Sequence, residues 1–295
     1  MYRSTIRVLV ALVCVGSLTL SLAGGSAIGI AMVNGVARVD NNDVRGNASI
    51  LDGSTVETGK GTSRLSLQGG ARVEFASESR GKVYRDHVVL EKGMGQLHAG
   101  KNFPVLANSL RVAATGSDST VRVSVKDAKT ILVNSVSGGA QVRNSHGLLL
   151  AKVMPGSTLE FNQEVQAGAA APVKITGCVG YKEGGFAIRD ETTNVMYEIK
   201  GPPVDTFVGK HVTVTGSIDP NTAPVAGADQ VVRFGAGGIA GVAGGGCPAA
   251  GPAGAAGAGL AAGAKVALIS GVVIAGVFIG LAAAGTFEES TQSGQ

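Results

Sequence analysis

The sequence predicts a mainly β protein, and three observations support this fold class. Apolar and polar residues alternate in short runs, such as 64–68 and 121–125, with the period of two that belongs to a strand. Glycine-containing turn signals such as Asp52-Gly53 and Gly69-Gly70 recur roughly every ten residues. Residues 28–161 hold no run of ten residues with helix caps and a 3.6-residue period. Such spacing is typical of a sandwich or roll.

The composition restricts the function before any motif is considered. The chain has 295 residues, of which 44% are hydrophobic and 4% aromatic, with no tryptophan. The net charge of +4 comes from basic residues interspersed with acidic ones. Binding of nucleic acid needs clustered Lys and Arg, so we expect no nucleic-acid partner. The composition also argues against a cytosolic nucleotide enzyme and a zinc protein.

Residues 1–27 predict a signal peptide. Arg3 and Arg7 precede an apolar stretch, and Gly25-Ser26-Ala27 gives the small-x-small pattern that signal peptidase cleaves. The alternative is an uncleaved anchor, because weakly polar residues continue to Val33. Either way, we expect an exported protein of the periplasm or cell envelope.

Residues 28–165 form the first predicted β domain. In the run 64–68, alternation places Leu65 and Leu67 on one face and Arg64, Ser66 and Gln68 on the other. Several turn-and-strand motifs in this range resemble a FecR-like domain: Asn34-Gly35, Leu51-Asp52-Gly53, 56–59, 70–75, 90–95, Phe103-Pro104-Val105, 131–142 and Pro155-Gly156-Ser157. The resemblance implies a periplasmic β-sandwich or roll. In their founding context, such domains relay a signal from an outer-membrane receptor to a sigma factor.

A second β module is predicted at 173–234, after an Ala/Gly-rich linker at 166–172. Four short strand patterns suggest a small OB-like β-barrel, and 209–216 is similar to the barrel-closing strand of bacterial OB modules. OB folds often bind oligonucleotides or sugars. Tyr181 and Tyr197 are therefore candidate ligand-facing aromatics, although aromatics in so small a module also suit its core.

The C-terminal part predicts a spacer and an anchor. Residues 235–263 are mostly Gly and Ala, which favours a flexible spacer. Residues 264–287 predict a transmembrane helix, because the uncharged run 266–287, of 22 residues, spans about 33 Å as a helix, against a hydrocarbon core of about 30 Å. Gly276 and Gly280 form a GxxxG pair that suits helix association, and a glycine-zipper insertion is the alternative. A short tail, 288–295, follows.

The remaining chemistry is sparse. Cys178 and Cys247 would be the two cysteines of the exported chain, and an oxidising compartment favours a disulfide between them over two free thiols. The four histidines lie far from one another and from cysteine, so we expect no metal site and no cofactor. No catalytic motif follows a strand, and we expect no catalytic residues and no enzyme activity.

These patterns predict an exported, membrane-anchored, non-enzymatic FecR-domain protein that serves as a protein-interaction or signal-sensing module in the bacterial cell envelope. Its partner would be an envelope protein, with the membrane held through the C-terminal helix. Two alternatives stay open: a protein that binds an envelope polysaccharide or ferric chelate through the OB-like module, and a structural envelope component that self-associates.

Overall fold

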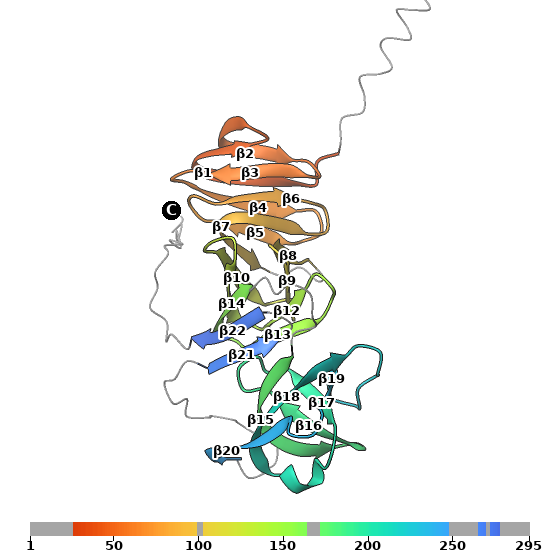
Figure 1. Ribbon diagram of the computed structural model, residues 1–295. Coiled ribbons are helices and arrows are strands. Elements are labelled where there is room, and N and C mark those ends of the chain that lie inside the picture. The colour runs from red at the N-terminus through yellow and green to blue at the C-terminus, as the bar shows by residue number, and fades with distance from the viewer. Residues whose placement is uncertain (1–25, 99–102, 164–171, 248–264, 270–271, 278–295) are drawn as a thin grey trace, which may run out of the picture.

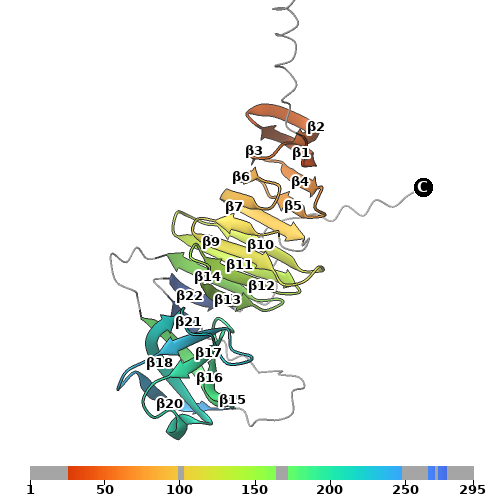
Figure 2. The same cartoon turned by 90° about the vertical axis from the view of Figure 1, so that its right-hand side faces the viewer.

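The computed structural model describes residues 26–98, 103–163, 172–247, 265–269 and 272–277. Its elements are strands, apart from the short 3-10 turn η2 (Asp205–Phe207). The strands stack into an elongated body whose N-terminal and barrel ends lie far apart (Figures 1 and 2). The prediction of a mainly β fold is confirmed. Residues 1–25 of the predicted signal peptide lie outside the described residues.

Fourteen strands form the first part of this body, which we call the roll. They are β1 (Gly29–Val39), β2 (Asn42–Ile50), β3 (Ser54–Thr58), β4 (Thr62–Leu67), β5 (Arg72–Phe75), β6 (Arg80–Val83), β7 (Val88–His98), β8 (Val105–Ala107), β9 (Leu110–Ala114), β10 (Thr120–Val125), β11 (Thr130–Ser137), β12 (Ala140–Asn144), β13 (Leu149–Val153) and β14 (Thr158–Gln163).

The roll consists of two sheets joined by two long strands. The first sheet has the order β2-β1-β4-β5-β7-β10-β11-β14. The second has the order β1-β3-β6-β7-β8-β9-β12-β13. β1 and β7 belong to both, because one half of each pairs in each sheet. β7 bends at Gly93, whose φ of +80° favours glycine and where a Cβ would meet the backbone of Ser79 at 2.7 Å.

The core lies between the two sheets. Leu65, Leu97 and Phe161 of the first sheet and Val56 and Leu90 of the second are at most 1% exposed. Burial of one such side chain contributes about 1.5–3 kcal/mol, so the alternating apolar positions supply most of the stability. Their period of two also fixes the register, since a slip of one residue would turn them toward solvent.

The second part is a closed barrel. Its strands are β15 (Val173–Lys182), β16 (Gly185–Arg189), β17 (Met196–Lys200), β18 (Lys210–Asp219) and β19 (Gln230–Arg233). They pair in the order β15-β16-β17-β19-β18, and β18 returns to β15. Only the pair β17–β19 is parallel within this ring. A further strand, β20 (Ile239–Gly246), pairs with β18, so the prediction of a flexible spacer at 235–263 is wrong for residues 239–246, and 248–263 lie outside the described residues. The prediction of a small β-barrel is confirmed.

The predicted helix at 264–287 is wrong where the structure describes it. Residues 265–269 and 272–277 form two strands, β21 (Lys265–Ile269) and β22 (Val272–Val277), and the remainder lies outside the described residues. β22 pairs with β14 along its whole length, and β21 pairs with β15 at Leu268 and Lys174. Among the described residues, no helix has the length and apolar character needed to cross a bilayer.

The sequence of this hairpin explains the difference. Six of its eleven residues are Val or Ile, whose branched side chains suit a strand better than a helix. β22 also finds a partner, because the edge of β14 offers it a ladder of backbone hydrogen bonds. The hairpin lies between roll and barrel, where both views show it beside β14 and β15 (Figures 1 and 2).

Candidate interaction surfaces

The outward side of the first sheet carries a row of polar side chains across six successive strands. Because strands β4, β5, β7, β10, β11 and β14 are in register, each member of this row lies opposite the next. We call the row the polar face; it consists of Arg64, Glu74, Gln96, Arg122, Asn134 and Thr158.

Hydrogen bonds join neighbouring members of the polar face. Arg64 Nη2 lies 3.0 Å from Glu74 Oε1, and Asn134 Nδ2 donates to Thr158 Oγ1 at 2.6 Å. Arg122 donates to Gln96 Oε1 from Nε at 3.2 Å and from Nη2 at 2.9 Å. Glu74 and Gln96 are each 8% exposed, so these hydrogen bonds satisfy polar groups that are shielded from solvent.

The orientation of the Gln96 amide determines the bonding of His98. A guanidinium has donors only, so Gln96 turns its oxygen toward Arg122 and its NH2 toward His98. Gln96 Nε2 lies 2.9 Å from His98 Nε2, and Thr120 Oγ1 lies 3.2 Å from His98 Nδ1. His98 Nε2 therefore accepts, and its Nδ1 donates to Thr120. The assignment follows from the hydrogen-bond network.

This arrangement gives the polar face fixed donors and acceptors on a rigid sheet. Arg64 and Arg72 are exposed there, and Ile30 and Met32 of β1 stay 54% and 46% exposed at its N-terminal end. Ordered polar groups beside exposed apolar ones suit recognition of a macromolecular surface. Sequence reasoning placed Arg64 on the polar side of β4 but did not find the row.

The barrel carries a pocket of about 440 Å³ between the start of β16 and the end of β17. Phe186, Glu198, Lys200 and Asp205 are among its lining residues. The Glu198 side chain is 4% exposed; its Oε1 lies 3.0 Å from Lys200 Nζ, and its Oε2 accepts from the backbone N–H of Val225 at 3.0 Å. Lys200 thus presents a positive charge held in place by a buried carboxylate.

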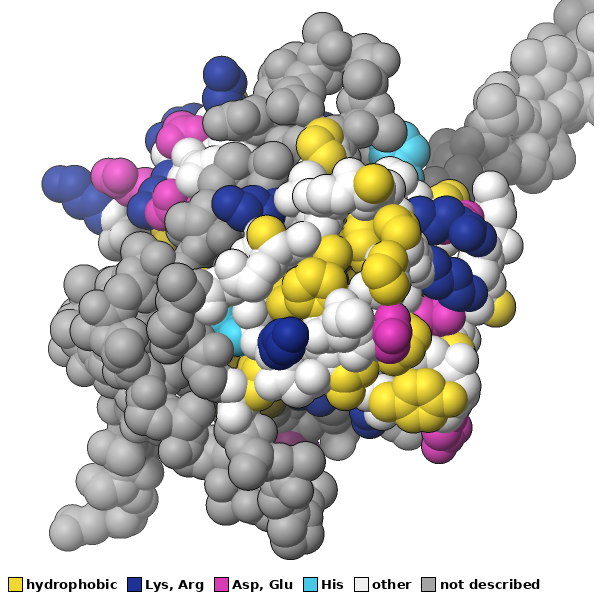
Figure 3. All heavy atoms as spheres, turned by 60° about the horizontal axis from the view of Figure 1, so that its bottom comes forward, with side chains coloured by type: hydrophobic (Ala, Val, Ile, Leu, Met, Phe, Trp, Pro, Cys, Tyr) yellow, Lys and Arg dark blue, Asp and Glu magenta, His cyan; other side chains and the backbone are white. Residues whose placement is uncertain are grey.

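The two candidate aromatics have different environments. Tyr181 is 65% exposed at the end of β15 and makes an edge-to-face contact with Phe186, with ring centroids 5.9 Å apart. The prediction of Tyr197 as a ligand-facing residue is wrong, because its side chain is 0% exposed in the barrel core. Burial raises the pKa of its hydroxyl. Figure 3 shows the barrel end of the molecule, where hydrophobic side chains gather beside basic and acidic ones.

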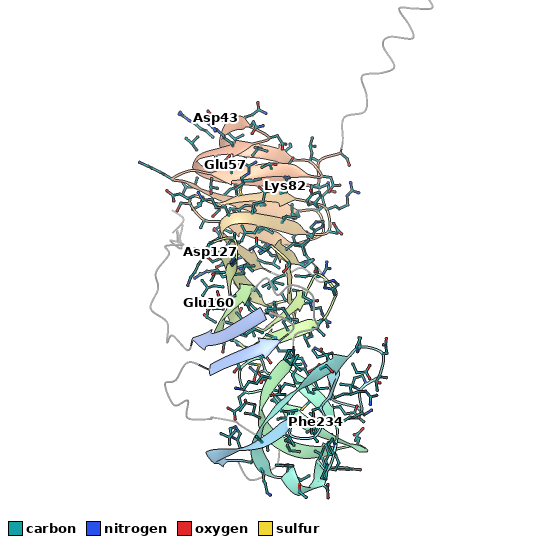
Figure 4. All side chains as sticks on the ribbon, in the orientation of Figure 1. Asp43, Glu57, Lys82, Asp127, Glu160 and Phe234 are labelled. Carbon is teal, nitrogen blue, oxygen red and sulfur yellow. A yellow bond between two sulfur atoms is a disulfide. The ribbon has the colours of Figure 1, made fainter. Side chains whose placement is uncertain are left out.

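A second pocket, of about 750 Å³, lies where β1 bends. β1 leaves β4 after Asn34 and joins β3 at Ala37, and this change opens the space. Its charged lining residues are Arg38, Asp43, Glu57 and Lys60. Arg38 Nε already binds Asp43 Oδ1 at 3.0 Å, so the charges of this pair are largely compensated. Figure 4 shows Asp43 and Glu57 at this end of the roll.

Other predicted residues lie as follows. Cys178 and Cys247 form a disulfide with a Cα–Cα distance of 5.7 Å. Gly276, predicted with Gly280 to mediate association between helices, lies instead in the strand β22 opposite Leu159, and Gly280 lies outside the described residues. His211 Nε2 lies 2.6 Å from Glu191 Oε1. In the described part of the chain, no group of three or more His, Cys, Asp or Glu residues could hold a metal ion.

Comparisons with known proteins identify no family for this chain. No family model matches the chain, and no curated protein matches it. Two crystal structures described as a "putative anti-sigma factor" from Parabacteroides distasonis align with 13% identity and a TM-score of 0.31. The alignment covers 37% of this chain and 54% of that one, so it spans about half the length of that protein. At this TM-score the likeness carries no argument about function.

Proposed function

We propose that the chain is an exported, non-enzymatic FecR-like protein of the bacterial cell envelope that acts as a protein-interaction or signal-sensing module. The observation that supports this function best is the polar face, where Arg64, Gln96 and Arg122 are held by hydrogen bonds on one side of a rigid sheet. A preorganised surface binds a protein partner without first having to order its own side chains.

Two further observations support export and interaction. The Cys178–Cys247 disulfide suits an oxidising compartment, to which the predicted signal peptide would direct the chain. The turn-and-strand motifs of the roll resemble those of periplasmic FecR-like domains, which implies a role in signalling. Membrane attachment through a helix beginning at 264 is not part of this proposal, because residues 265–269 and 272–277 are strands.

Site-specific photocrosslinking in cells tests the proposal. A photoreactive residue at Ser66, which is exposed beside the polar face, should capture an envelope protein in the full-length chain. The matched control is Arg111, exposed on β9 of the second sheet. Mass spectrometry of the adducts would support the proposal if one envelope protein is recovered from Ser66 and not from Arg111. Equal capture from both positions, or none from Ser66, would overturn it.

A second candidate function is binding of an envelope polysaccharide or ferric chelate by the barrel. The pocket beside Lys200 and the exposed Tyr181 favour it, since OB folds bind ligands on their second and third strands and adjoining loops. β16 and β17 are these strands in the barrel. Titration with polysaccharide fractions and ferric siderophores tests it. Tyr181→Ala and Lys200→Ala should each weaken binding at least tenfold, whereas Tyr197→Phe should not. Unchanged binding in both Tyr181→Ala and Lys200→Ala would contradict this function.

A further inference from the structure

We propose that the edge of β14 is a strand-acceptor site, and that a second copy of this chain occupies it by exchange of the C-terminal hairpin β21–β22. This inference is independent of the proposed function. β22 of the same chain occupies this edge, and it shows the length and composition of a strand that fits there.

The roll needs an occupant at this edge. β22 pairs with all six residues of β14, and Ile274 lies opposite Phe161, both 0% exposed. Without β22, the outer ladder groups of β14 would lose their partners, and Phe161 would lose the buried cross-strand neighbour Ile274. Open edges of this kind are templates for pairing with another chain.

The hairpin reaches this edge through a connection that is longer than needed. Cys247 is held to β15 by its disulfide, and β21 pairs with β15 at Leu268. Following β15 and β21 between these points gives a separation of at most about 34 Å between Cys247 and Lys265. The 17 residues 248–264 can extend over about 60 Å. The same hairpin can therefore reach β14 of a neighbouring copy.

Exchange would preserve the strand pairs that the hairpin makes with β14 and β15. Each copy would donate its β21–β22 hairpin and receive an identical one, so the pairs Glu160–Ala275 and Leu159–Gly276 would form between copies. Domain swapping of this kind is an inexpensive route to a dimer. Because the tether favours pairing within one chain at low concentration, the exchanged dimer should increase with protein concentration.

Cysteine cross-linking between differently tagged full-length copies tests the exchange. One copy carries Glu160→Cys and the other Ala275→Cys, which are cross-strand partners and therefore within disulfide range. The control pairs Glu160→Cys with Leu132→Cys, because Leu132 of β11 lies opposite Glu160 on the other side of β14 and is not exchanged. A third protein carries Glu160→Cys and Ala275→Cys in one chain.

We expect a mixed disulfide dimer from the Glu160/Ala275 copies, with a yield that rises at least fivefold between low and high micromolar protein, and none from the Glu160/Leu132 copies. A cross-link within the double variant but no mixed dimer would show that the hairpin stays in its own chain, and would overturn the proposal. Mixed dimers from both pairs would indicate unspecific contact and would also overturn it. So would the absence of any cross-link in the double variant, because the β14–β22 register would then be wrong.

Discussion

Gln96 and Arg122 lie opposite each other on β7 and β10, and one oxygen of Gln96 accepts both hydrogen bonds from the Arg122 guanidinium, at 3.2 and 2.9 Å. This contact connects the middle strands of the polar face. It also orients the Gln96 amide so that its NH2 group points to His98. The two residues thus link the charged Arg122 guanidinium to the neutral hydrogen bonds of His98 and Thr120.

Gln96→Ala should lower the free energy of unfolding by about 1–3 kcal/mol, because it removes a buried acceptor from Arg122 and a donor from His98. Urea denaturation of the full-length protein measures this change. Ser66→Ala, exposed on the same side of the sheet, should stay within about 0.5 kcal/mol of the wild type. Equal urea midpoints for Gln96→Ala and the wild type would contradict the network described above.

Removal of the disulfide should destabilise the barrel. The double variant Cys178→Ser and Cys247→Ser opens a link across a sequence separation of 69 residues. The chain-entropy model gives a loss of about 4 kcal/mol for such a loop. Urea unfolding with and without reductant checks this value. The wild type in reductant should resemble the variant, and the variant should not respond to reductant. A wild-type curve that reductant leaves unchanged would speak against the bond.

The two tyrosines should differ in their effect on stability. Tyr197→Ala should cost about 3–5 kcal/mol, because it leaves a large cavity in the barrel core. Tyr181→Ala should stay within about 1 kcal/mol, since its side chain is mostly in water. Thermal unfolding of the full-length variants provides the comparison. Similar losses in both variants would mean that Tyr181 packs more tightly than its exposure indicates.

The strands and the barrel could be predicted from the sequence because alternation and turn signals are local. Leu65 and Leu67 face the core as their period of two predicts, and glycine turns separate the strands. The sequence was insufficient for Tyr197 because alternation places Tyr197 and Ile199 on one face of the strand, but Met196 adds an apolar residue to the other face. Only the closure of the barrel, which pairs β17 with β16 and β19, decides that Tyr197 faces inward.

Two other features depend on contacts between distant parts of the chain. The run from Val266 has the hydropathy of a membrane helix, but hydropathy does not include the hydrogen bonds that β14 offers to β22. The polar face also cannot be predicted from any single stretch of sequence, because Arg64, Gln96 and Arg122 come from strands far apart in sequence. A usable signal was present, since each occupies a polar position in an alternating run.

The ion pair of Asp219 should make the barrel sensitive to acid. Hydrogen bonds from Thr222 at 2.6 Å and from Arg233 at 2.6 Å lower the pKa of Asp219 to about 2, from an ordinary value of 3.8. A depressed carboxyl pKa stabilises the fold above 3.8, and this contribution is lost as the pH falls toward 2. The difference in urea midpoint between the wild type and Asp219→Asn should therefore be constant from pH 7 to pH 5 and shrink below pH 4.

The partner side chain provides the control for this pH dependence. In an Arg233→Gln background, Asp219→Asn should have a smaller effect at pH 7, because the charged donor to the carboxylate is gone. The pH at which the remaining effect disappears should also rise toward the ordinary carboxyl range, since Arg233 contributes to the lowered pKa. A wild-type difference that persists unchanged to pH 2, or one that grows as the pH falls, would contradict the assignment of this pair.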